Sequence, residues 1–397
     1  METSEFRTKT ILNFKKDGEK ADTDTMYPIG LDIGYSSVKV YSKSAVVCFP
    51  AYAEINENDV NVMLSGGNEQ AIYYIGSDGV KWTVGACAQD SIATNDTTAG
   101  SLAIYGRMRY FNPMFKVLAL TGIAAGMRDV SGWHTRKPVA IQTGLPPAYF
   151  KSDESLIVES LTGHHEFSVK FGTGKWEKFS IDIDKNNLLI MDQPMGTFYS
   201  VSIDRLGHLN RTYMASKVLI ADPGFGTFDV FSVDGGQGKR RNAQSLDLGM
   251  KQVLIDTCDE IFDKYKTEIS IPAFQRYLLT GSVPVRSGRG YIDQPFKDIL
   301  EKHSKDVCRK ALDNIQDTYN PALEFDYLVI TGGTGAAWLD YVREYFGESG
   351  RLKIIGGNAG DPELPFMFSN VRGYFYYIMF QTHVNKIKTP VLANEKQ

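Results

Sequence analysis

The chain has 397 residues, 43% apolar and 23% charged, which is ordinary for a globular protein with a large core. Its formal net charge of −4 argues against a strongly basic nucleic-acid binder, and its four scattered cysteines argue against a zinc site or a disulfide framework. No apolar run approaches the roughly 18 residues of a membrane span and no signal-peptide pattern is present, so we expect a cytoplasmic protein.

Residues 1–26 are polar and mixed in charge, and we interpret them as an N-terminal extension ahead of the first strand. Their apolar cluster at residues 11–14 leaves two interpretations open. Either the extension is a disordered tail, or the cluster docks on the body of the protein or on a neighbouring subunit.

Residues 27–40 have the pattern of an apolar strand, a glycine turn and a second strand. The first strand contains Asp32, Gly34 follows two residues later, and Ser36 and Ser37 add small hydroxyl groups. Glycine lets the backbone approach a ligand closely, and successive N–H groups in such a turn can bind an anion.

Residues 45–132 contain several strand-like runs and a predicted helix at 114–128, and we interpret them as an insertion. A strand at 137–143 then ends in a Gly-Leu-Pro-Pro turn. After further strands, the segment 192–199 contains Gln193, which from local sequence alone is a turn amide beside Pro194.

Residues 219–230 repeat the first pattern. An apolar strand leads to Asp222, and Gly224, Gly226 and Thr227 follow it. The carboxylate cannot contact a phosphate without repulsion, so Asp222 makes sense if a hydrated divalent cation lies between them. Taken alone, the pattern fits an ordinary β-hairpin equally well.

A helix is predicted to begin near Gly249, which could let the helix start approach a ligand closely. Residues 283–291 read as a basic surface loop. A third glycine turn, with Gly332, Gly333 and Thr334, follows a strand and precedes a helix, and it lacks the lysine of a P-loop.

The order of these three turns resembles the superfamily of actin, sugar kinases and heat-shock chaperone ATPases, over about residues 27–380. Within it, the chain is most similar to bacterial plasmid-segregation actins of the ParM/StbA type. The stretches that carry this likeness are residues 143–150 (TGLPPAYF), the turn at 222–229, and residues 368–374 (FSNVRGY), which resemble the element that opens the family's C-terminal helix.

The resemblance implies an actin-like α/β fold of two related, ribonuclease H-like domains with a nucleotide cleft between them and a smaller insertion in each. Domain I would comprise residues 27–215 and 371–397, with the insertion at about 45–132. Domain II would comprise residues 216–370, with its insertion at about 251–325.

The resemblance also implies ATP or GTP with Mg²⁺ in the cleft. Asp32 and Asp222 would be catalytic carboxylates that hold the metal mainly through water, and Gln193 would orient the attacking water. The implied nucleotide-binding residues are Gly34, Tyr35, Ser36, Ser37, Lys39, Gly224, Phe225, Gly226, Thr227, Gly249, Gly332, Gly333 and Thr334.

The function implied is that of an ATPase that polymerises with ATP into head-to-tail filaments. It would segregate plasmid DNA through a centromere-binding adaptor protein, without direct DNA binding and without a membrane. Two alternatives stay open. One is a small-molecule kinase of the same superfamily, for which Asp229 could be the base. The other is a structural filament protein that binds nucleotide without turnover.

Overall fold

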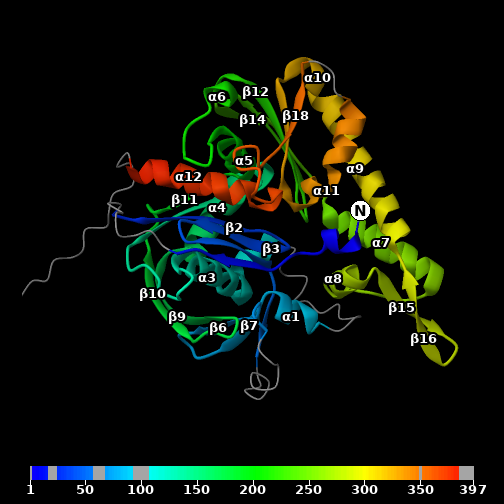
Figure 1. The fold of residues 1–397 in the computed structure, drawn as a ribbon, viewed down its shortest axis with the longest axis horizontal. Coiled ribbons are helices and arrows are strands. Elements are labelled where there is room, and N and C mark those ends of the chain that lie inside the picture. The colour runs from blue at the N-terminus through cyan, green and yellow to red at the C-terminus, as the bar shows by residue number, and fades with distance from the viewer. Residues whose placement is uncertain (1, 17–24, 57–67, 93–106, 348–350, 384–397) are drawn as a thin grey trace, which may run out of the picture.

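A computed structural model describes residues 2–16, 25–56, 68–92, 107–347 and 351–383, and two β-sheets organise it (Figure 1). The first sheet has the order β1 (Ile11–Phe14), β4 (Ala45–Pro50), β3 (Ser37–Ser42), β2 (Tyr27–Ile33), β8 (Val139–Leu145), β11 (Leu188–Asp192). The second has the order β14 (Gln237–Leu246), β13 (Phe228–Asp234), β12 (Lys217–Pro223), β17 (Tyr327–Ile330), β18 (Lys353–Gly356).

The two sheets share one topology. In the first, β4, β3 and β2 pair antiparallel, and β8 and β11 continue parallel to β2. In the second, β14, β13 and β12 pair antiparallel, and β17 and β18 continue parallel to β12. This repetition divides the chain into two related α/β halves, with β1 as an additional edge strand on the first sheet.

Helix α3 (Pro113–Met127) covers one face of the first sheet, against β2, β3 and β4. It begins with Pro113 at its first position and with the Asn112 side chain accepting a hydrogen bond from the Met114 N–H, a favourable helix start. The sequence placed both β4 and α3 in an insertion at 45–132. Both belong to the main layers of the first half, because β4 is a strand of its sheet and α3 packs against that sheet.

A separate five-stranded sheet lies beyond α3. Its order is β10 (Glu177–Ile183), β9 (Gly163–Phe171), β6 (Ile72–Gly76), β7 (Lys81–Val84), β5 (Ala53–Ile55). The short helix α1 (Ala86–Asp90) contacts β5 and β7 of this sheet and β4 of the first, and helix α4 (Phe150–Leu161) contacts β8 and β11 of the first sheet. Residues 57–67 and 93–106, which the sequence assigned to the insertion, lie outside the described residues.

Helices α5 (Gln193–Ser202) and α12 (Ser369–His383) cross on the opposite face of the first sheet (Figure 1). They approach so closely that a Cβ at Gly373 would lie 1.7 Å from the Gly196 carbonyl oxygen. Glycine at both positions is what allows this crossing. Residues 384–397, assigned to the first domain from sequence, lie outside the described residues.

The second sheet is covered by a helical layer with its own apolar core. Its helices are α7 (Met250–Tyr265), α8 (Ile271–Thr280), α9 (Lys297–Tyr319) and α11 (Gly332–Phe346), with α6 (Arg211–Ala215) and α10 (Pro321–Glu324) as short connections. Residues 283–291, predicted as a loop, form most of the hairpin of β15 (Ser282–Ser287) and β16 (Gly290–Pro295). No described helix is long and apolar enough to cross a membrane.

The N-terminal segment is packed on both halves of the molecule. Its short 3₁₀ helix η1 (Thr3–Phe6) lies against α8, and β1 then adds to the edge of the first sheet by pairing with β4. In Figure 1 the dark blue segment runs from the helical layer to the first sheet. Of the two interpretations from sequence, docking of residues 11–14 on the body of the protein is therefore confirmed.

Candidate functional site

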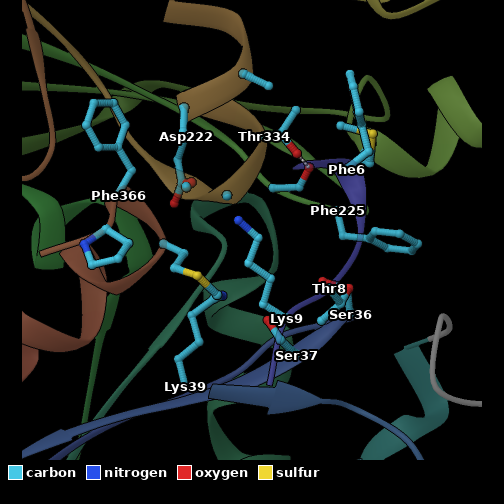
Figure 2. A pocket seen from close by; sticks show the side chains of 18 of the residues that line it. Phe6, Thr8, Lys9, Ser36, Ser37, Lys39, Asp222, Phe225, Thr334 and Phe366 are labelled. Atoms are coloured by element: carbon cyan, nitrogen blue, oxygen red, sulfur yellow. Dashed lines mark hydrogen bonds between the residues drawn. The ribbon is translucent and has the colours of Figure 1, made fainter. Parts of the chain in front are cut away.

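A cavity of about 390 Å³ lies where the two halves meet (Figure 2). The turn after β2 contributes Ser36 and Ser37, and the turn after β12 contributes Gly224 and Phe225. Further lining residues come from the starts of α5, α7 and α11, from the segment 365–370 that leads into α12, and from the N-terminal segment. Segments far apart in sequence therefore enclose one space.

The two turns have the same backbone geometry. The Gly34 N–H donates to the Ser37 carbonyl oxygen at 2.9 Å, and the Gly224 N–H donates to the Thr227 carbonyl oxygen at 2.8 Å. The turns also lie close together, because a Cβ at Gly226 would be 2.8 Å from the Tyr35 ring. The repeated sequence pattern thus corresponds to a repeated structure.

Asp32 and Lys39 face each other across the first hairpin, as partners in the β2–β3 register. The Lys39 Nζ lies 3.0 Å from Asp32 Oδ2, and both side chains are largely buried. Burial alone would lower the pKa of Lys39, but the negative charge of Asp32 and, more weakly, that of Asp222 raise it. Lys39 is therefore charged, and its ammonium group interacts with both carboxylates.

Asp222 is buried at the end of the equivalent strand, β12, and lines the cavity. Burial raises the pKa of its carboxyl to about 6, while a hydrogen bond from Asn370 Nδ2 to Asp222 Oδ2 at 2.7 Å opposes that shift. Gly332 lies beside it with φ of +76°, and a Cβ there would be 2.6 Å from Asp222 Oδ1. Only glycine leaves this space beside the carboxylate open.

Polar contacts connect the start of α12 to α5 behind the cavity. The Thr197 hydroxyl lies 2.7 Å from Asn370 Oδ1 and 2.9 Å from the Thr331 hydroxyl. Asn370 therefore contacts Asp222 of the second half and Thr197 of the first. Gln193, proposed from sequence to orient the attacking water and alternatively a turn amide, is the first residue of α5 and lines the cavity.

The structure places the residues proposed from sequence in two groups. Those that line the cavity are Ser36, Ser37, Lys39, Gln193, Asp222, Gly224, Phe225, Gly332, Gly333 and Thr334. Those that do not line it are Asp32, Gly34, Tyr35, Gly226, Thr227 and Gly249. Asp32 is connected to the cavity through its ion pair with Lys39. Gly249 precedes α7, whose first N–H groups hold the second turn: the Met250 N–H donates to the Gly224 carbonyl at 3.1 Å, and the Lys251 N–H donates to the Phe225 carbonyl at 2.7 Å.

Sequence reasoning missed several parts of the lining, and two of them carry polar or charged groups. Asn370 was visible in the motif at 368–374, but without the fold nothing connected it to Asp222. The segment Glu5, Phe6, Arg7, Thr8 and Lys9 was missed entirely, since a short polar stretch carries no local signal for a binding wall.

The donor set bears on which metal the site could hold. Among the described residues there is no group of three or more His, Cys, Asp or Glu side chains. Asp222 is buried at the cavity and Asp32 is paired with Lys39, so the protein offers few carboxylate oxygens. This chemistry fits Mg²⁺, which keeps several waters and binds proteins through one or two carboxylates plus substrate phosphates.

Residues 30–196 match the family described as the N-terminal domain of actin-like proteins. No curated protein sequence matches the chain. Among solved structures, a 15-stranded ParM filament from Clostridium botulinum aligns with a TM-score of 0.67 at 17% identity, over 89% of this chain and 99% of that one. The apo psk41 ParM protein aligns with a TM-score of 0.61 at 20% identity, over 92% and 99%.

The archaeal actin homologue Ta0583 in complex with ADP aligns with a TM-score of 0.58 at 16% identity, over 89% of this chain and all of that one. At these identities the solved structures establish the fold. The family match adds that residues 30–196 resemble the N-terminal domain of actin-like proteins. Together they confirm the resemblance to ParM-type proteins that the three glycine turns indicated. Residues 30–196 match the N-terminal domain of actin-like proteins, and the chain as a whole has the two-domain actin-like fold.

Proposed function

We propose that this chain is an ATPase that binds ATP, or GTP, together with Mg²⁺ in the cavity between its two domains. One observation carries the proposal: two hairpin turns of the same geometry, one from each domain, line a single cavity together with Asp222 and Lys39. Paired anion-binding turns that face one space suit a polyphosphate better than a small neutral ligand.

In this proposal the phosphates lie between the two turns. Backbone N–H groups and the hydroxyls of Ser36 and Ser37 would contact them from one side, and the turn from Gly224 to Thr227 from the other. The N-terminus of α11 opens on the same cavity through Gly332, Gly333 and Thr334, which would lie under the adenosine and the α-phosphate.

Asp222 and Asp32 would hold Mg²⁺ mainly through water, and the ion when bound supplies positive charge that neutralises the phosphates. Gln193 would orient the attacking water. Its amide can hold a water in place but cannot act as a strong base, so positioning and charge neutralisation would supply the rate.

The two alternatives differ from this proposal in ways that can be measured. A kinase needs a base at the γ-phosphate, and Asp229 is buried in the sheet and does not line the cavity. A structural protein without turnover would bind nucleotide and release no phosphate.

We further propose that ATP drives assembly into head-to-tail filaments. Binding both turns to one nucleotide would hold the two domains together, and subunit contacts specific to that closed state would couple nucleotide to polymerisation. The likeness to a ParM filament structure supports self-association. Plasmid segregation would proceed in the cytoplasm through a centromere-binding adaptor, because the net charge of −4 does not favour direct binding to DNA.

The test compares wild type with Asp222→Asn, whose amide oxygen can still accept the hydrogen bond from Asn370. We expect wild type to pellet with ATP and Mg²⁺, to release phosphate, and to stay in the supernatant with ADP. The variant should release phosphate about a hundredfold more slowly, as expected when one electrostatic contact to the reacting groups is lost. Asp234→Asn, an exposed change on β13, is the matched control.

Normal phosphate release by Asp222→Asn would refute the site. ATP binding by wild type without polymer at any protein or salt concentration would refute the filament. Transfer of phosphate to a small acceptor, or no release over hours, would favour the kinase or the structural alternative, respectively.

A further inference from the structure

Residues 2–14 bridge the two domains along the edge of the cavity. At one end they are anchored in domain II. Phe6 is 6% exposed in the apolar core of the helical layer, and the Thr3 hydroxyl donates to the Leu278 carbonyl at 2.8 Å. The Thr8 N–H donates to Gln275 Oε1 at 3.1 Å. These contacts fix the segment on α8.

The other end is anchored in domain I. Strand β1 pairs antiparallel with β4 through the whole of residues 11–14. Between the two anchors, Arg7 forms an ion pair of 3.0 Å with Asp90, whose backbone carbonyl also accepts from Arg276 Nη1 at 2.8 Å. The short span between Thr8 and Ile11 therefore has little freedom and passes beside the cavity.

Lys9 lies in this span. In Figure 2 its side chain extends from the N-terminal segment into the space between Lys39, Asp222 and Thr334, and all four residues line the same cavity. The backbone around Lys9 is held by contacts of Thr8 and of residues 11–14, and not by contacts of the lysine side chain. In the described part of the chain, no carboxylate forms an ion pair with its ammonium group.

The charges around the cavity explain why an unpaired lysine matters here. The charged residues of the lining are Glu5, Arg7, Lys9, Lys39 and Asp222. Arg7 is paired with Asp90 and Lys39 with Asp32, so within the described residues Lys9 is the cation of the lining without an acidic partner.

A nucleoside triphosphate remains negative after one divalent cation has bound to it. Glu5 and Asp222 would oppose such a ligand, and the two paired cations already have partners. A free ammonium group that extends into the cavity supplies the missing positive charge, and charge-assisted contacts to phosphate are among the stronger hydrogen bonds.

We propose that Lys9 is a further phosphate-binding residue of the nucleotide site, carried on an N-terminal segment that connects both domains. This inference rests on the proposed nucleotide binding and assigns to residues 2–14 a direct role in it. Because the segment is anchored in both domains, a contact between Lys9 and the phosphates adds a third connection between them, beside the two hairpin turns.

The experiment measures affinity for ATP with Mg²⁺, and separately for adenosine, by calorimetry on the full chain. Lys9→Gln should weaken ATP binding roughly tenfold, as expected for the loss of one charge-assisted contact. It should leave adenosine binding unchanged, because adenosine has no phosphate. Lys9→Arg should retain most of the ATP affinity.

Two controls separate this contact from other effects. Lys16→Gln removes the same charge from an exposed position beyond β1, and it should leave ATP affinity at the wild-type value. Asp222→Asn tests the nucleotide site independently of the N-terminal segment. All these changes except Asp222→Asn are at exposed side chains, so the variants should fold as wild type does.

Unchanged or tighter ATP binding by Lys9→Gln would overturn the inference. So would a loss of ATP affinity in Lys16→Gln as large as that in Lys9→Gln, or a loss of adenosine affinity in Lys9→Gln as large as its loss of ATP affinity. If wild type binds ATP and Asp222→Asn alone weakens it, the proposed function stands and the role of Lys9 fails. If wild type binds no nucleotide, both fail.

Discussion

Asp229 is a buried titratable carboxyl whose effect on stability can be worked out from the structure. It pairs with Asp222 in the β12–β13 register, and its Oδ1 atom is buried without a hydrogen-bond partner. Burial and, more weakly, the charge of Asp222 raise the pKa of its carboxyl from 3.8 to about 7, while a hydrogen bond from the Thr227 hydroxyl to Asp229 Oδ2 at 3.3 Å opposes the shift. Such a shift costs the folded state about 4 kcal/mol above pH 7.

The sign of the effect follows from proton binding. The folded state holds the Asp229 proton up to about pH 7, whereas the unfolded chain releases it near pH 4. The free energy of unfolding therefore falls as pH rises through this window and is constant above it. Between pH 5 and pH 7 the loss is about 3 kcal/mol, at roughly 1.4 kcal/mol for each pH unit.

Asp229→Asn removes this dependence because the amide is neutral at every pH. The stability of the variant minus that of wild type should therefore increase by about 3 kcal/mol from pH 5 to pH 8. The amide also replaces an acceptor oxygen by an NH₂ donor, which by itself changes the stability by about 1–3 kcal/mol. That change is the same at both pH values, so it cancels from the comparison.

The assay is urea unfolding of nucleotide-free protein at pH 5 and pH 8, followed by circular dichroism. Asp234→Asn, an exposed carboxylate on the same strand, is the matched control and should show no such pH dependence. If Asp229→Asn and wild type change in parallel between the two pH values, Asp229 is ionised in the folded state throughout and the reasoning is refuted.

Two further predictions concern packing. Phe6→Ala should lower the free energy of unfolding by about 3 kcal/mol, because Phe6 is buried in the core of the helical layer. Urea unfolding measures this effect, with Phe380→Ala as the control because Phe380 is 57% exposed. A loss for Phe6→Ala no larger than that for Phe380→Ala would contradict the prediction. Gly249→Ala should weaken ATP binding at least severalfold in calorimetry, because its Cβ would lie 2.4 Å from the Phe225 carbonyl oxygen and push α7 away from the turn. Gly290→Ala, which meets open space, should bind as wild type does.

Local sequence was sufficient for the parts of the site that are themselves local. A strand, an aspartate and a glycine two residues later specify a hairpin turn within about ten residues. The turns after Asp32 and Asp222 accordingly have the predicted form. The third turn was predictable for the same reason, because Gly332 follows an apolar strand and opens a helix.

Features that depend on distant partners could not be predicted. β4 was placed in an insertion because its own sequence does not reveal that β3 on one side and β1 on the other complete a sheet. Residues 283–291 were read as a basic loop, although Val283 and Val285 bury one face of a hairpin against the helical core. The hydrogen bond from Asn370 to Asp222 joins positions 148 residues apart.

The two hairpins share a backbone but differ in charge, and this difference bears on how the proposed ligand would be held. At equivalent positions, the first hairpin pairs Asp32 with Lys39, and the second pairs Asp222 with Asp229. The first pair is neutral as a unit, whereas the second consists of two buried carboxyls with raised pKa values. A positive charge added near Asp222 therefore relieves a cost that is absent beside Asp32. In the proposed complex, the metal should stabilise domain II more than domain I, and the direct contact from lysine to phosphate should come from Lys9, because Lys39 is paired with Asp32.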